Sequence, residues 1–206
     1  MNRRFALTGA RIFDGENWHD RAAVVVNEGI VEGVIAADFP TDMERVGLPG
    51  GMLVPGFVDL QDNGGGGALL NATPTLEAIR TICETFWQYG TTACLPTLVT
   101  DTPEVTDRVV EAGLEAASQN VRSFLGLHVE GPHLAVSRKG AHDPALIRPF
   151  SDNDLQRLIP ARSGMPNLLT TVAAETVTPD EIPSIVAANI VVSIGHSDAS
   201  YQLVAD

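Results

Sequence analysis

Hydrophobic and polar positions follow two different patterns before and after residue 51. Residues 5–13 alternate imperfectly and end at an Asp-Gly pair, which is typical of a turn. Two further apolar runs, 22–26 and 30–36, flank the turn sequence Asn-Glu-Gly and predict a β-hairpin. A Leu-Pro-Gly-Gly loop ends the pattern, so we expect a small β-rich module over residues 1–51.

From residue 52 to residue 206 the pattern predicts strands and helices in alternation. Apolar runs predict five strands, at 52–60, 91–95, 124–129, 168–174 and 190–194. Helix-starting signals follow each run, at Thr73-Pro74, Thr102-Pro103, Ser151, Thr178–Glu181 and Ala199. This alternation is typical of βα units that form a parallel sheet. An open doubly wound sheet is the competing architecture, but Gly64–Gly67 lacks the G-x-G-x-x-G spacing of a dinucleotide-binding loop.

Composition narrows the class of protein. The chain has 206 residues, fewer than the roughly 250 of a complete (β/α)₈ barrel. Its net charge of −13 argues against nucleic acid as a partner, and its apolar runs are too short for a membrane span. Cys83 and Cys94 lie in apolar segments and are expected to be buried thiols of a reducing compartment. We therefore expect a cytoplasmic protein.

Polar residues that could carry chemistry cluster at the predicted strand ends. They are Asp59, Gln61, Asp62 and Asn63 after the first strand, His128, Glu130 and His133 after the third, Glu175 after the fourth, and His196, Ser197 and Asp198 after the fifth. Because the carboxyl ends of barrel strands meet at one face, these groups are candidates for a shared site. A carboxylate and an imidazole from different strands are common metal ligands. Each residue also has a structural interpretation, as a turn cap or a hydrogen-bonded loop residue.

Five motifs occur in order along the chain: PGFVDLQDNGGGG (55–67), LPTLVT (95–100), GLHVEGPHL (126–134), RKGAH (138–142) and SIGHSDAS (193–200). Together they resemble the N-acetylglucosamine-6-phosphate deacetylase family of the amidohydrolase superfamily. The resemblance implies a metal-dependent (β/α)₈ barrel with a small β-sandwich built from both chain ends. We therefore expect an α/β fold: an incomplete TIM-type barrel of the first five βα units, preceded by part of the sandwich.

The resemblance also implies roles for individual residues. Glu130 and His196 match two of three protein ligands of one divalent metal, zinc first, with iron, cobalt or manganese as alternatives. His142, with Ala141 beside it, matches a histidine that contacts substrate near the acetamido group. Gln61 and Asn63 stand where other amidohydrolases bind a second metal, and we count them among the substrate-binding residues. His133 is expected to fill a wall of the site, and Ser197 and Asp198 to support the loop after His196.

The activity implied is hydrolysis of N-acetylglucosamine 6-phosphate to glucosamine 6-phosphate and acetate, with a homodimer as the full-length form. The family's third ligand histidine and its general-base aspartate are expected beyond Asp206, so we assign no catalytic residue in this chain and expect the chain alone to be inactive. One alternative is a non-catalytic half-barrel that needs a partner chain. Another is an amidohydrolase acting on a different amide, against which Gln61, Asn63 and the Lys139–His142 motif argue.

Overall fold

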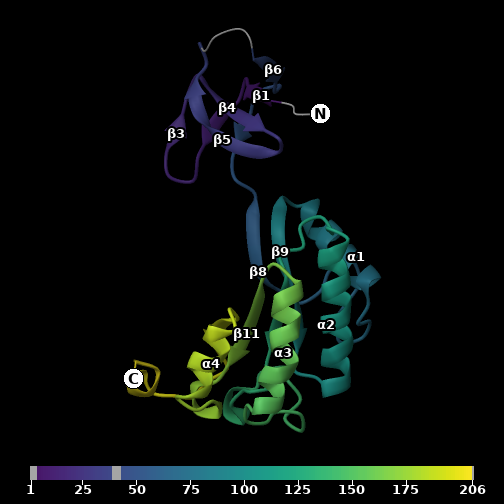
Figure 1. Ribbon diagram of the computed structural model, residues 1–206. Coiled ribbons are helices and arrows are strands. Elements are labelled where there is room, and N and C mark those ends of the chain that lie inside the picture. Colours follow the sequence, from purple (N-terminus) through teal and green to yellow (C-terminus); the bar gives the residue numbers. More distant parts are fainter. Residues whose placement is uncertain (1–3, 39–42, 206) are drawn as a thin grey trace. The chain divides into compact units, whose positions relative to one another are not determined.

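The computed structural model describes residues 4–38 and 43–205 (Figure 1). Contacts between residues divide the chain into two compact units, Met1–Gly56 and Phe57–Asp206. The boundary predicted after residue 51 stays a prediction. Within the described residues, no helix is both long and apolar enough to cross a lipid bilayer.

The first unit consists of short strands in two sheets. The strands are β1 (Arg4–Thr8), β2 (Arg11–Phe13), β3 (Trp18–His19), β4 (Ala22–Asn27), β5 (Ile30–Ala36), β6 (Glu44–Gly47) and β7 (Met52–Leu53). One sheet has the order β5-β4-β1-β6 and the other β3-β2-β7. The antiparallel β4–β5 pair confirms the predicted hairpin, with a β-bulge between Val25 and Val26. Ile12, Ala22 and Val24 form a buried cluster that joins strands of both sheets.

The second unit is built on a five-stranded parallel sheet that curls as half of a barrel. The strands are β8 (Phe57–Asp62), β9 (Thr91–Val99), β10 (Leu127–Glu130), β11 (Leu168–Val172) and β12 (Val191–Ile194), in the order β12-β11-β10-β9-β8. Every neighbouring pair runs parallel, as the alternation of strands and helices predicts. The carboxyl ends of all five strands therefore lie along one edge of the sheet.

Helices connect the strands and cover the sheet. They are α1 (Leu76–Trp87), α2 (Pro103–Ser118), α3 (Asp152–Gly164), α4 (Glu181–Ala187) and α5 (Tyr201–Ala205), with short 3₁₀ turns η1 (Val136–Arg138) and η2 (Ala174–Thr176). Helices α1, α2 and α3 lie beside one another against the sheet (Figure 1). Their apolar faces and the strands share one core, which includes Ile79, Ile82, Val109, Leu127, Leu158 and Leu168. As predicted, Thr102 caps α2 by accepting a hydrogen bond from the Val105 amide.

Several boundaries differ from the sequence-based prediction: β9 continues to Val99 rather than ending at residue 95, and β11 ends at Val172 rather than at residue 174. The single strand predicted at 52–60 is wrong: β7 and β8 belong to different sheets, and Pro55, which has no N–H to donate, lies between them. Helix α1 begins after Thr75 rather than Thr73, since the Thr75 hydroxyl accepts from the Ala78 amide. The strand predicted from residue 124 begins at Leu127.

The two cysteines are buried and free, with their sulfurs 3.6 Å apart.

Candidate metal centre

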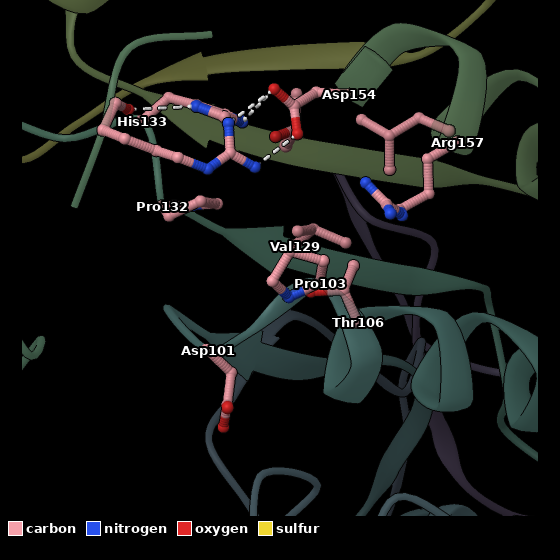
Figure 2. Close-up of a pocket in the computed structure, with 12 residues that line it drawn as sticks. Asp101, Pro103, Thr106, Val129, Pro132, His133, Asp154 and Arg157 are labelled. Carbon is pink, nitrogen blue, oxygen red and sulfur yellow. Dashed lines mark hydrogen bonds and ion pairs between the residues drawn. The ribbon is translucent and has the colours of Figure 1, made fainter. Parts of the chain in front are cut away.

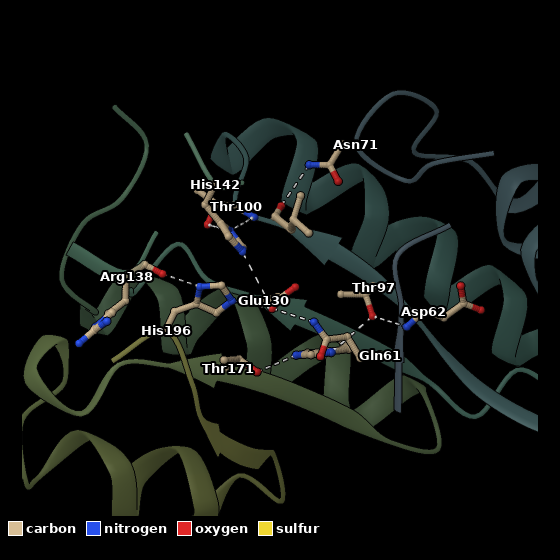
Figure 3. A network of polar contacts seen from close by, with 12 residues as sticks. Gln61, Asp62, Asn71, Thr97, Thr100, Glu130, Arg138, His142, Thr171 and His196 are labelled. Carbon is tan, nitrogen blue, oxygen red and sulfur yellow. Dashed lines mark hydrogen bonds and ion pairs between the residues drawn. The ribbon is translucent and has the colours of Figure 1, made fainter. Parts of the chain in front are cut away.

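Four side chains from separate elements meet at the carboxyl edge of the sheet (Figure 3). Glu130 is the last residue of β10, Gln61 lies near the end of β8, and His196 follows β12 by two residues. His142 comes from the loop after η1. Ligand atoms of Glu130, His142 and His196 lie within 4.8 Å of one another. Gln61, Glu130 and His196 are among the strand-end candidates, whereas His142 was expected from the family resemblance alone.

The hydrogen bond behind His196 fixes which ring nitrogen faces Glu130. Nδ1 lies 2.8 Å from the carbonyl oxygen of Arg138, and because a carbonyl only accepts, Nδ1 carries the proton. The neutral ring therefore presents the bare Nε2, 3.1 Å from Oε1 of Glu130. When the ring is neutral, two atoms with lone pairs face each other, and a cation between them, a proton or a metal ion, makes the contact favourable. Two ligands of a tetrahedral zinc ion lie roughly 3.3 Å apart, so the spacing fits a shared metal.

His142 has the opposite orientation of donor and acceptor. The backbone N–H of Thr100 donates to its Nδ1 over 3.3 Å, and the Thr100 hydroxyl lies 2.8 Å from the same nitrogen. An Nδ1 that accepts from the amide leaves the proton of the neutral ring on Nε2. That Nε2 lies 3.9 Å from Oε1 of Glu130. Burial lowers the pKa of His142 more than the neighbouring Glu130 raises it, which favours the neutral ring. His142 therefore offers the site a hydrogen-bond donor, whereas His196 offers a lone pair.

The remaining predicted residues divide into one that joins the cluster and two that lie at its margin. The side-chain amide of Gln61 donates to Oε1 of Glu130 over 2.8 Å and orients that carboxylate. Asn63 is exposed one residue beyond β8, and Ala141 is exposed next to His142. In the part of the chain that the structure describes, neither has a hydrogen bond to the cluster.

A second buried carboxylate lies between the sheet and α3 (Figure 2). Arg148 donates to both oxygens of Asp154, over 2.6 and 2.7 Å, and the Ser151 hydroxyl adds a third hydrogen bond. Burial acts to raise the pKa of Asp154, but the hydrogen bonds from Arg148 and Ser151 outweigh it and lower the pKa to about 2. The adjoining cavity, lined also by His133, encloses about 20 Å³ and is too small for a ligand larger than water.

His133 belongs to this second group and not to the metal centre. Its ring packs edge-on against Phe150, with centroids 4.8 Å apart, and its Nδ1 lies 3.2 Å from the Arg148 carbonyl oxygen. Its Nε2 lies 3.9 Å from Asp154. The predicted role of His133 as a filler of the site wall stays a prediction.

Sequence reasoning missed two residues that decide the chemistry of the cluster, Thr100 and Arg138. Arg138 acts through its backbone carbonyl, so its residue type carries little signal. Thr100 contacts Nδ1 of His142 through its backbone N–H and also through its hydroxyl. Both do lie inside motifs already noted, at the end of LPTLVT and at the start of RKGAH. Position within a motif was therefore the only available clue.

The family model described as the NagA composite domain matches residues 4–53. The N-acetylgalactosamine-6-phosphate deacetylase of Shewanella sp. (strain ANA-3) is 39% identical over 199 residues, which are 95% of this chain and 50% of that protein. The N-acetylglucosamine-6-phosphate deacetylase of Haemophilus influenzae is 36% identical, over 97% of this chain and 52% of that protein. The chain thus spans about half the length of these relatives.

Solved structures give the same picture. The crystal structure of N-acetylglucosamine-6-phosphate deacetylase from Pasteurella multocida matches with a TM-score of 0.88 and 33% identity, over 97% of this chain and 52% of that one. A mutant of the Mycobacterium smegmatis enzyme in complex with N-acetyl-D-glucosamine-6-phosphate matches with a TM-score of 0.84 and 28% identity, over 98% of this chain and 52% of that one. Along nearly its whole length the chain is thus similar to the N-terminal portion of N-acetylglucosamine-6-phosphate deacetylases.

Proposed function

We propose that the protein hydrolyses the acetamido group of N-acetylglucosamine 6-phosphate at one divalent metal ion held by Glu130 and His196. The observation that carries the proposal is the bare Nε2 of His196 facing the Glu130 carboxylate at 3.1 Å. The names of the relatives support the substrate class. Zinc suits the nitrogen and oxygen donors, as do iron, cobalt and manganese.

Each residue of the cluster has a separate task in the proposed reaction. Glu130 and His196 would hold the metal, and Gln61, which donates to Oε1, orients the Glu130 carboxylate. A metal bound there would lower the pKa of a water ligand and polarise the acetyl carbonyl. Nε2–H of His142 donates to the substrate near its acetamido group and orients the carbonyl for attack. Water adds to the carbonyl carbon, the C–N bond breaks, and the amine leaves with a proton.

Other groups of the proposed site come from the family resemblance. It assigns the third ligand histidine and the general-base aspartate to positions after residue 206. For this reason we assign no proton transfer to a carboxylate of this chain and propose that residues 1–206 alone are inactive. Ala141 and Asn63 are proposed as substrate contacts.

The proposed architecture completes the observed one. The curled five-stranded sheet is the first part of a (β/α)₈ barrel, and residues 1–51 are part of a β-sandwich domain. The full-length enzyme is proposed to act as a homodimer in the cytoplasm.

N-acetylgalactosamine 6-phosphate is a second candidate substrate. It is favoured by the 39% identity to a deacetylase named for that compound. The two sugars differ only in configuration at one ring carbon, and the acetamido chemistry is the same. The proposed site accounts for the reaction with either sugar.

The test is deacetylation by the full-length protein, followed as acetate release from each sugar phosphate and from unphosphorylated N-acetylglucosamine. We expect turnover of at least one phosphorylated sugar and its loss in Glu130→Gln. No release from either sugar phosphate would overturn the proposed activity. Metal analysis should give one ion per chain, and two ions per chain would contradict the single-metal site.

A further inference from the structure

The backbone at His196 is in an unfavourable conformation that contacts with surrounding residues must stabilise. Its φ is +50°, in the left-handed region that non-glycine residues rarely adopt. Backbone hydrogen bonds hold both flanks: the Gly195 amide donates to Val172, and the Ala135 amide donates to the His196 carbonyl, each over 3.0 Å. Nothing in these bonds fixes the residues that follow His196.

Glu175 holds the chain immediately after His196. This residue lies in η2, directly after β11, and it is exposed. One carboxylate oxygen accepts from the Ser197 hydroxyl over 2.5 Å, and the other accepts from the Asp198 amide over 2.7 Å. Both oxygens are thus used on the two residues that follow the candidate ligand.

The contacts continue from Asp198 back to the ring of His196. The Asp198 carboxylate accepts from the Arg138 guanidinium over 2.6 and 2.9 Å. The carbonyl of the same Arg138 accepts the proton of Nδ1 of His196 over 2.8 Å. A chain of contacts therefore runs from Glu175 through Asp198 and Arg138 to the imidazole of His196. These contacts set the direction in which Nε2 points.

Within this chain of contacts, the hydrogen bonds made by Glu175 and the Arg138–Asp198 ion pair hold different atoms. The Arg138 and Asp198 side chains are 60% and 50% exposed, and such surface pairs contribute at most about 1 kcal/mol. Short hydrogen bonds to an ionised carboxylate are roughly twice as strong as neutral ones. One of them also restrains the backbone of Asp198 directly.

We propose that Glu175 is a positioning residue for the metal centre: it holds the His196 turn so that Nε2 stays aimed at Glu130. The inference rests on the proposed function, because it concerns affinity for the metal. Glu175 itself contacts neither the metal site nor the substrate site. Loss of such outer contacts typically lowers metal affinity about 10–100-fold.

The test is Zn²⁺ affinity of the full-length protein, measured by competition with a chromogenic chelator, for Glu175→Ala and its matched control Glu181→Ala. Glu181 lies in the same β11–β12 connection, and its carboxylate also accepts from a backbone amide, that of Thr178, over 2.6 Å. We expect Glu175→Ala to weaken Zn²⁺ binding about 10–100-fold, and the control to bind as the wild type does. The melting temperatures of the two metal-free variants should be similar.

A second variant, Ser197→Ala, tests whether the loss of Zn²⁺ affinity follows the hydrogen bonds of Glu175. Ser197→Ala removes one of the two hydrogen bonds and should give a smaller loss of Zn²⁺ affinity than Glu175→Ala. Wild-type affinity in Glu175→Ala, or an equal loss in Glu181→Ala, would overturn the role of Glu175. Zn²⁺ binding that Glu130→Gln leaves unchanged would overturn the proposed metal centre as well, which separates the two failures.

Discussion

Two buried carboxylates lie beside histidines in the second unit, and their surroundings differ. Asp154 has both oxygens filled by Arg148, with Ser151 as a further donor. Glu130 accepts one amide hydrogen bond, from Gln61, and faces the bare nitrogen of His196. The first group has a permanent cation of its own in Arg148, whereas the second has only a histidine opposite its carboxylate.

This difference separates a structural group from a ligand set better than residue type does. Both groups pair a carboxylate with an imidazole. In both groups a backbone carbonyl lies against Nδ1 of the histidine, so the ring proton does not separate them. The distinguishing feature is the partner of the carboxylate: the Arg148 guanidinium donates to both oxygens of Asp154, whereas Glu130 has no guanidinium among its partners in the described residues. A guanidinium already bound to Asp154 leaves no reason for a metal there.

The largest expected effect is from Glu130→Gln. The amide keeps the shape of the side chain but removes the anionic ligand, so the metal should be lost. Deacetylation by the full-length protein should fall about 10²–10³-fold, with little change in the melting temperature of the metal-free form. Retained metal and activity in this variant would remove the distinction between the two carboxylates.

Asp154→Asn should have the converse result. It leaves the Arg148 guanidinium without its anion, so the free energy of unfolding should fall by about 2–3 kcal/mol. Metal content per folded chain should be unchanged. Urea unfolding together with metal analysis checks both parts, and a loss of metal at wild-type stability would show that the roles have been assigned the wrong way round.

His142→Asn tests whether the two histidines of the metal centre differ. Since His142 presents a donor rather than a lone pair, the variant should keep its metal. The value of kcat/KM should fall about tenfold or more, because a hydrogen bond to the substrate is lost. If the metal is lost as completely as in Glu130→Gln, His142 is a ligand.

Acid should affect the Asp154 group in a defined range of pH. Its pKa is lowered to about 2 from an ordinary 3.8, so its contribution to stability is present above about pH 4 and is lost as the pH falls toward 2. The contribution is about 2 kcal/mol. Asp154→Asn should unfold with a correspondingly flatter dependence on pH between 4 and 2, and an unchanged slope would contradict the assignment.

Local sequence signals predicted the elements whose cause is local. The turn at 27–29 marked the β4–β5 hairpin, and Thr102-Pro103 marked the start of α2. Apolar runs followed by a polar residue placed Glu130 at a strand end. The split of residues 52–60 between two sheets was missed, because both halves are apolar and only their different partners separate them.

The orientation of the ring nitrogens of His196 and His142 could not be predicted from the sequence. It depends on Arg138, 58 residues before His196, and on Thr100, 42 residues before His142. Arg138 acts through a backbone carbonyl, which every residue possesses, and Thr100 acts through its backbone N–H together with its hydroxyl. Only the folded chain shows which of them meets an imidazole.

The most direct test of the central claim is the anomalous scattering of crystals of the metal-loaded, full-length protein at the absorption edge of the bound ion. The comparison of the two carboxylates predicts one peak, between Oε1 of Glu130 and Nε2 of His196, and none beside Asp154 and His133. A peak at Asp154, or its absence at Glu130 in crystals that contain the metal, would contradict the account.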